Sequence, residues 1–260
     1  MEKNVLITLA AIVLAASACS SGTGKMTMNT QTDMEHFGGK VQIFLGGKGT
    51  ATLDWGDGTE KETHTLSDYT ELTHSYSEAS AHTITVIGKN VTRLNCNWTQ
   101  LTALDVSMNT ELKKLDCGNN DQLTTLDVSK NTALEELVCS GIQLTALDVS
   151  ENTELTYLAC NGNLLTSLDV NRNTELEQLD CSYNRLISLD VSKNTKLIRL
   201  NCSGNELSAA ALNSLFETLR TIPDSNDNEG IIDISYTPGM DDCNTGIAKN
   251  KRWYVDIYEY

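Results

Sequence analysis

Hydrophobic residues recur with a period of 21 residues between residues 91 and 206. Each unit reads L-x-x-L-x-C-x-x-N-x-L and continues as T-x-L-D-V-S-x-N-T-x. The cysteines that mark the period are spaced by 21, 22, 21, 21 and 21 residues and comprise Cys96, Cys117, Cys139, Cys160, Cys181 and Cys202. One such unit cannot bury its apolar face alone, so the repeat predicts a solenoid whose neighbouring units share a continuous core.

The first half of each unit has the alternation of a short β-strand. Leu115 and Cys117 alternate with Lys114 and Asp116, which is the period of two that strands have. We expect the leucine and cysteine side chains to face the core, the polar side chains to face outward, and the strands to stack in parallel. The buried leucine column is expected to comprise Leu115, Leu137, Leu158, Leu179 and Leu200.

Polar columns accompany the strands. An asparagine that follows the strand is expected to bond backbone groups of the next coil, because a buried bend leaves such groups unpaired; these residues are Asn120, Asn163, Asn184 and Asn205. An aspartate column comprises Asp105, Asp127, Asp148, Asp169 and Asp190. Two interpretations of this column are open, a cation-binding ladder or side chains that satisfy local turns. The second is favoured because one aspartate per coil supplies few cation ligands.

The chain has eight cysteines, and in an exported protein disulfides are the default expectation. Six of them share one repeat position, and parallel side-chain vectors in a stack do not favour the disulfide dihedral angle. We therefore expect a reduced and buried cysteine column. A metal site needs thiolates that converge on one point, which a linear stack does not provide, so no metal and no other cofactor is predicted.

The start of the chain has the pattern of a secretory signal. Lys3, an apolar run over residues 5–16 and small residues before Cys19 predict a signal peptide over residues 1–18. Residues 19–38 are polar and without apolar periodicity, and we expect them to form a tether.

Two further segments flank the repeats, which we place at residues 90–206. Residues 39–89 contain short alternating runs and a tight turn after Trp55 in WGDGT, which predict a small β-sandwich-like module. Residues 207–260 contain a helix N-cap at Ser208 and a strand around Trp253, so an α/β C-terminal cap is expected.

These patterns resemble known families. The repeat resembles the leucine-rich repeat, with cysteine in place of a leucine or isoleucine, and its LDVSxNT half is similar to a variety common in cell-surface proteins of Bacteroides-type bacteria. The resemblance implies a mainly β, curved solenoid with a parallel sheet on its concave side, and a binding role without chemistry of its own. The signal resembles that of bacterial lipoproteins, which implies lipidation of Cys19 and an envelope anchor, at the outer membrane. Residues 39–89 resemble PKD-type immunoglobulin-like modules, which are usually spacers or adhesion elements.

Charge and candidate chemistry narrow the function further. The net charge of −16 makes nucleic acid a poor partner. All four histidines precede the repeats, and none has the HExxH spacing or accompanies a serine–aspartate pair in the repeats, so an enzyme is not predicted.

Two function classes therefore remain. The first is a binding protein that holds a protein or glycan on the concave face, and the second is an envelope protein whose solenoid is a spacer. For the first class, exposed aromatic residues are the expected anchors and basic residues the expected rim. The candidate binding residues are Arg93, Trp98, Lys114, Tyr157, Tyr183 and Arg199.

Overall fold

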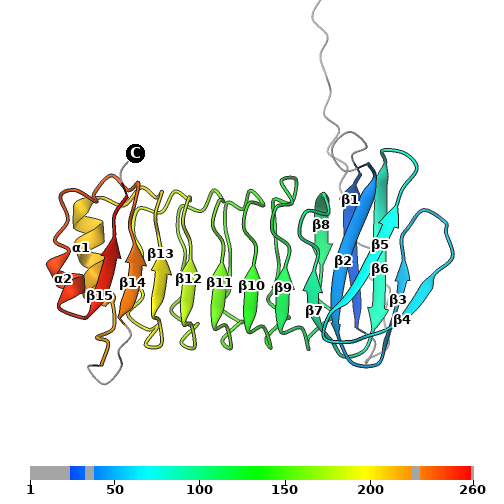
Figure 1. The fold of residues 1–260 in the computed structure, drawn as a ribbon, viewed down its shortest axis with the longest axis horizontal. Helices are drawn as coiled ribbons and strands as arrows, with labels where there is room; N and C mark the ends of the chain where they lie inside the picture. Colours follow the sequence, from blue (N-terminus) through cyan, green and yellow to red (C-terminus); the bar gives the residue numbers. More distant parts are fainter. Residues whose placement is uncertain (1–23, 33–37, 224–228, 259–260) are drawn as a thin grey trace, which may run out of the picture.

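The computed structural model describes residues 24–32, 38–223 and 229–258. Within these residues the chain forms two β-sheets and two helices, arranged in an elongated molecule (Figure 1). The signal peptide predicted over residues 1–18 and the lipidation predicted at Cys19 lie outside the described residues.

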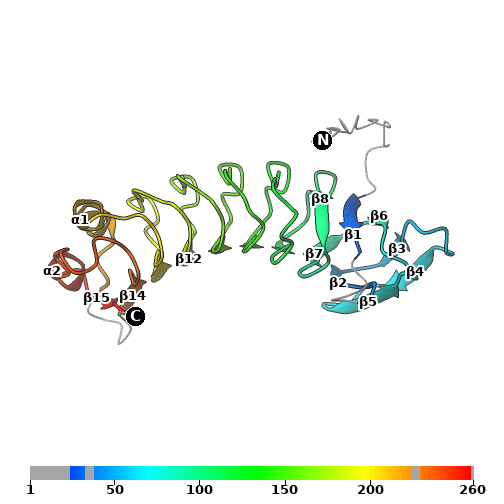
Figure 2. The same ribbon diagram turned by 90° about the horizontal axis from the view of Figure 1, so that it is seen from above.

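The larger sheet runs the length of the solenoid and contains, in the described residues, eight strands in parallel register. These strands are β7 (Val91–Asn95), β9 (Lys114–Asp116), β10 (Glu136–Val138), β11 (Tyr157–Ala159), β12 (Gln178–Asp180), β13 (Arg199–Asn201), β14 (Gly230–Asp233) and β15 (Trp253–Asp256). Figure 2 shows them on the inner side of a shallow arc, with the connecting turns on the outer side. The predicted mainly β solenoid with 21-residue repeats and a concave parallel sheet is confirmed.

The two predicted apolar columns form the core of the solenoid. Each of the five leucines named above is at most 2% exposed, and the six repeat cysteines are fully buried with free thiols. A valine column from the second half of each repeat closes the other side of the core and comprises Val106, Val128, Val149, Val170 and Val191. Apolar burial from both halves of each coil therefore stabilises the stack.

The asparagine that follows each strand joins two coils. Nδ2 of Asn120 donates to the carbonyl oxygen of Cys117 at 2.8 Å and to that of Cys96 at 3.0 Å, while its Oδ1 accepts from the N–H of Leu101 at 2.9 Å. The equivalent contacts recur at Asn163, Asn184 and Asn205. A bond to a neighbouring coil was expected, but its partner is the preceding coil rather than the next one. The unpaired backbone groups belong to that earlier coil.

A second asparagine ladder follows the turns between the strands. Nδ2 of Asn131 donates to the carbonyl oxygens of Val106 and Asn109, both at 2.9 Å and both in the preceding coil. Asn152, Asn173 and Asn194 make the same pair of bonds. We call this set, together with Asn109, the turn ladder.

The aspartate column serves its own turns. Oδ1 of Asp148 accepts from the N–H of Ser150 at 2.9 Å. The four equivalent aspartates bond the N–H two residues later in the same way. The local-turn interpretation of this column is therefore confirmed.

The N-terminal module is built from two packed sheets. One has the strand order β4-β3-β6-β1-β8, with β1 (Lys25–Gln31), β3 (Thr50–Asp54), β4 (Glu62–Thr65), β6 (Ala81–Gly88) and β8 (Leu101–Asp105). The other consists of β2 (Lys40–Gly47) and β5 (Thr70–Ser75), which pair antiparallel and extend the solenoid sheet beyond β7. The module therefore caps the first coil.

Strand β1 lies within the segment for which we predicted a tether. Met26 and Met28 alternate with polar residues there and are fully buried, so residues 25–31 belong to the module rather than to a tether. Strand β8 comes from the first repeat and pairs antiparallel with β1. Each of the two sheets thus contains strands from before and from after residue 90, and both sheets join the module to the repeats.

The C-terminal cap combines β14 and β15 with α1 (Ala209–Thr218) and α2 (Gly246–Lys249). Ser208 caps α1, since its Oγ accepts from the N–H of Ala211 at 3.3 Å. Leu212, Leu215 and Phe216 are buried on one side of the helix, as the sequence predicts. In the part of the chain that the structure describes, no helix is long and apolar enough to cross a membrane.

Candidate binding face

Four of the six predicted binding residues lie in one row on the concave sheet. The row is formed by the residue that precedes each buried leucine, and strand register places its members side by side. In spatial order it comprises Arg93, Lys114, Glu136, Tyr157, Gln178, Arg199, Ile231 and Tyr254. The sequence thus correctly placed Arg93, Lys114, Tyr157 and Arg199 on one surface.

The charges in this row are partly neutralised. Lys114 forms an ion pair with Glu136 on the neighbouring strand. Among the described residues, neither Arg93 nor Arg199 has an ion-pair partner. These two guanidinium groups are therefore available for a ligand, one at each end of the repeat array.

A second row, formed by the residue after each buried leucine, carries four carboxylates. Asp116, Asp180, Asp233 and Asp256 belong to it. Burial raises the pKa of the Asp116 carboxyl above its ordinary value. One carboxylate oxygen of Asp180 accepts from the N–H and the hydroxyl of Ser182, at 3.0 and 2.6 Å.

The two rows meet in a concavity of about 230 Å³ near the C-terminal end of the face. Tyr157, Asp180, Arg199 and Asp233 line it. Burial raises the pKa of the Tyr157 hydroxyl, which is therefore a neutral hydrogen-bond donor at physiological pH. The concavity places an aromatic ring, a guanidinium group and carboxylates on one surface. Such groups make polar contacts in protein–protein interfaces.

The remaining two predicted residues, Trp98 and Tyr183, lie outside the strands. β7 ends at Asn95 and β12 at Asp180, and the two aromatic residues occupy the turn that follows each strand. They are 58% and 53% exposed. Strand spacing of about 4.8 Å separates their coils by roughly 19 Å along the solenoid, so they form two contact points at one edge of the face rather than one cluster.

Both aromatic residues have a left-handed backbone. The same turn position has positive φ in every repeat, and other coils fill it with Asn119, Gly141, Gly162 and Gly204. Trp98 has φ +59° and Tyr183 has φ +50°. A bulky residue in this region costs roughly 1–2 kcal/mol, whereas glycine adopts it freely.

Tyr183 depends on its neighbour in the next coil. A Cβ added at Gly204 would lie 2.6 Å from Cδ1 of Tyr183, so the ring rests directly on that glycine. The contact with Gly204 thus holds a half-exposed ring against the next coil. Residues held in strained conformations concentrate at functional sites.

Sequence reasoning missed the part of the face that the C-terminal cap supplies. Ile231, Asp233 and Tyr254 continue the two rows, and Tyr254 is 57% exposed. The signal was present, because I-D-I-S at residues 232–235 matches L-D-C-S in the repeats with isoleucine in place of leucine and cysteine.

Comparison with solved structures supports this architecture. The functional domain of InlJ from Listeria monocytogenes, described as including a cysteine ladder, is 35% identical in sequence and matches with a TM-score of 0.54 over 64% of this chain. This chain spans about a third of that relative, since 34% of its length is covered.

The chain has the leucine-rich repeat fold.

Two further internalins of Listeria monocytogenes are similar to the leucine-rich repeat solenoid. InlF has 18% identity and a TM-score of 0.48 over 59% of this chain and 44% of its own. InlC2 has 15% identity and a TM-score of 0.49 over 65% of this chain and 81% of its own. No protein-family model matches the sequence, and no curated protein does.

The cysteine ladder named for InlJ has a counterpart here in the column from Cys96 to Cys202. Sγ of Cys96 lies 3.5 Å from the carbonyl oxygen of Asp116 in the next coil, and Sγ of Cys181 lies 3.5 Å from that of Asn201. All six thiols fill the core, and those of Cys96, Cys117, Cys181 and Cys202 also donate a weak hydrogen bond to the next coil.

Proposed function

We propose that the protein is a non-catalytic binding protein that holds a protein partner on its concave face. The single observation that carries the proposal is the pair Trp98 and Tyr183. Both rings are exposed at turn positions where glycine or asparagine serves in the other coils, at a cost in backbone strain. Glycine adopts this backbone conformation without strain, so a solenoid that served only as a spacer would have no need of exposed rings at both positions.

The partner is expected to contact both the aromatic edge and the two rows of the sheet. Trp98 and Tyr183 are the anchors, since exposed aromatic residues dominate binding energy in protein interfaces. The concavity at Tyr157 and Arg199 supplies polar recognition. The net charge of −16 favours a neutral or basic partner surface.

The test begins with a lipid-free chain of residues 20–260, which lacks the signal peptide and Cys19, on an array of extracellular-matrix proteins and glycans. For a ligand that binds, replacing both Trp98 and Tyr183 by Gly is expected to weaken affinity by about 30-fold or more, because hot-spot truncations cost about 2 kcal/mol or more. The urea midpoint of the double variant is measured alongside, so that a loss of binding is distinguished from a loss of stability.

The matched control is Ile187→Ala, which truncates an exposed apolar side chain that is 64% accessible and lies outside the two rows. It should bind normally. If the double glycine variant binds every array ligand as the wild type does, the concave-edge assignment is wrong. If the chain binds glycans on the array but none of the proteins, the partner is a carbohydrate and not a protein.

We further propose that the protein is anchored to the cell envelope, at the outer membrane, by lipid on Cys19, and that its PKD-type module is a spacer between anchor and solenoid. The anchor is supported by the sequence of residues 1–19, and the PKD-type module by the resemblance of residues 39–89. Cys19→Ala should release the protein from the membrane fraction or stall its processing, because lipoprotein processing attaches more than one acyl chain and several chains anchor stably. Wild-type protein that stays soluble and takes up no labelled fatty acid would contradict this proposal.

A further inference from the structure

The first rung of the turn ladder lacks its partner. Asn131, Asn152, Asn173 and Asn194 each donate both Nδ2 hydrogens to main-chain carbonyls of the preceding coil, but no repeat precedes Asn109. In the described residues Nδ2 of Asn109 makes no hydrogen bond, although the side chain is only 4% exposed. Its Oδ1 is also without a partner, a property that it shares with the other four ladder asparagines. The unused Nδ2 distinguishes Asn109. It is not among the fully buried atoms without a partner, so it is open to the pocket beside it and can donate to a ligand there.

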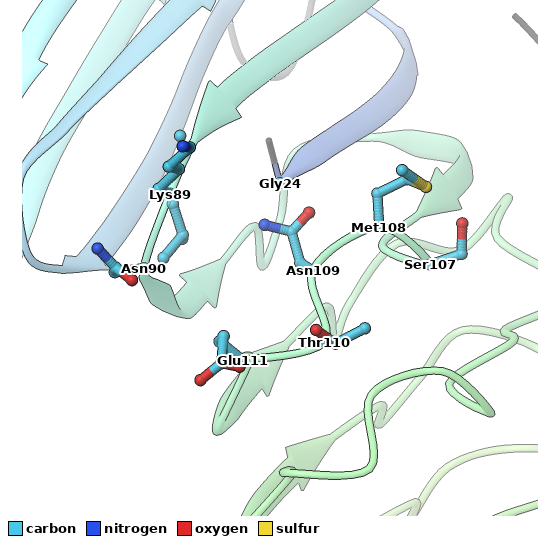
Figure 3. Close-up of a pocket in the computed structure, with 10 residues that line it drawn as sticks. Gly24, Lys89, Asn90, Ser107, Met108, Asn109, Thr110 and Glu111 are labelled. Atoms are coloured by element: carbon cyan, nitrogen blue, oxygen red, sulfur yellow. The ribbon is translucent and has the colours of Figure 1, made fainter. Parts of the chain in front are cut away.

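A pocket lies where the missing coil would stand. Its volume is about 400 Å³, within the range of ligand sites. The turn between β6 and β7 forms one wall with Lys89 and Asn90, and the turn over residues 107–111 forms the other (Figure 3). The amide of Asn109 projects from the second wall with its nitrogen directed toward the first (Figure 3).

Glycine keeps this pocket open. A Cβ added at Gly24 would lie 2.8 Å from Nδ2 of Asn109 and 2.7 Å from the carbonyl oxygen of Gly88. Any larger residue at position 24 would cover the amide. The space in front of Asn109 therefore depends on the residue type at the start of β1.

The lining suits a neutral hydrogen-bonding ligand. Lys89 and Glu111 contribute opposite charges, so the pocket has no dominant field for an anion or a cation. Val91 is buried in its floor, and the hydroxyls of Ser107 and Thr110 lie on its rim. The rest of the turn ladder shows what such an amide binds, namely two main-chain carbonyl oxygens of one tight turn.

We propose that this pocket binds a peptide turn of a partner protein, whose two carbonyl oxygens accept from Nδ2 of Asn109 as those of Val106 and Asn109 accept from Asn131. The bound turn takes the place of the absent coil and continues the ladder outward by one rung. None of the lining residues belongs to the two rows of the concave face. The pocket is therefore separate from the proposed binding face, and the two proposals can be tested independently.

The test uses nuclear magnetic resonance on the lipid-free chain of residues 20–260, with the peptide acetyl-LDVSKNT-amide as the probe. This peptide has the sequence of residues 126–132, the turn whose Val128 and Asn131 carbonyl oxygens accept from Nδ2 of Asn152 within the solenoid. Saturable shifts of the Asn109 side-chain amide signals are expected, identified by the absence of these signals from Asn109→Leu. A scrambled peptide of the same composition should produce no saturable shift.

Asn109→Leu is expected to weaken peptide binding roughly 30-fold, or about 2 kcal/mol, because both hydrogen bonds from Nδ2 are lost. Its urea midpoint should not fall, since the replaced amide has no hydrogen bond to lose. The matched control, Asn152→Leu, removes the same amide from the middle of the ladder. It should lower the urea midpoint and leave peptide affinity unchanged.

Three results would overturn the proposal. The first is the absence of saturable binding by the wild-type chain, and the second is equal affinity of Asn109→Leu and wild type. The third concerns a competing occupant, the residues that precede Gly24. If the peptide binds only after those residues are removed, the pocket belongs to the chain's own N-terminal segment and not to a partner.

Discussion

At the residue scale, the repeat cysteines behave as small apolar side chains that cannot ionise in place. Burial is the main cause that raises the pKa of all six thiols, and for Cys160 it raises the pKa to about 12. The nearby Asp180 carboxylate adds to the effect at Cys160. The reactive form of cysteine is the thiolate, so these side chains are inert while the solenoid is folded.

We therefore predict two populations of thiols. In native protein Cys243, which is only half-buried, should react first with a thiol reagent, and the six repeat cysteines should react only as the chain unfolds. In denaturant all seven cysteines from Cys96 to Cys243 should titrate as free. Cys243→Ser is the control, and it should remove the fast phase alone. Two or fewer free thiols in denaturant would contradict the reduced column.

The same thiols predict the behaviour of stability at high pH. The folded-state pKa lies above the ordinary value of 9.0, so the folded chain binds more protons than the unfolded chain above that pH. The stabilisation is fully present below pH 9 and is lost as the pH rises toward the folded-state pKa of about 12. The urea midpoint measured from pH 8 to pH 10 should fall in the upper part of that range.

At the scale of the elements, the sequence predicts the strands that recur in every repeat, and it misses a strand that occurs only once. The strands β9 to β13 follow from alternation within each repeat, because the same leucine and cysteine must reach one shared core. β1 has the same alternation through Met26 and Met28, but it is a single short run in a polar segment. Its strand state depends on β6 and β8, which flank it in the sheet and lie far away in sequence.

β8 shows the limit of the repeat pattern most clearly. Leu101 to Asp105 has the sequence of the irregular half of a repeat, and in later coils the same residues form turns and extended segments without strand pairing. Only the first copy meets a free strand edge, that of β1, and becomes a strand itself. The local sequence of this segment is similar in all coils, so the neighbouring strand decides whether the segment forms a β-strand.

The candidate site follows the same division. Register on the sheet could be predicted from the period, and it brings Arg93, Lys114, Tyr157 and Arg199 into one row. The left-handed backbone at Trp98 and Tyr183 could not be read from those residues themselves. It was visible only in their equivalents, since Gly141, Gly162 and Gly204 occupy the same position of the repeat.

At the scale of the whole molecule, the N-terminal module and the solenoid form one stack. β2 and β5 continue the concave sheet, while β1 pairs with β6 of the module on one side and with β8 of the first repeat on the other. A solenoid needs a cover for its first apolar coil. The module supplies that cover through two sheets at once, so the stability of the first coil depends on the module.

This coupling predicts how a destabilising substitution in the module affects the repeats. Met28 is fully buried and faces Ile84 on β6 and Leu104 on β8 in strand register. Met28→Asp buries an unpaired charge there and is expected to destabilise the module by several kcal/mol. Because each coil contacts only its neighbours, the loss should reach the first repeats and fade along the array.

Hydrogen exchange measured by mass spectrometry tests this gradient. In Met28→Asp, exchange should accelerate in the module and in residues 91–106, while residues 176–235 keep the protection of the wild type. Asn29→Asp is the control, since Asn29 is a partly exposed residue of β1 whose register partners, Thr83 and Ala103, carry no charge. If residues 91–106 in Met28→Asp exchange as slowly as in the wild type, the module is an independent domain. The repeats would then need a different cover for their first coil.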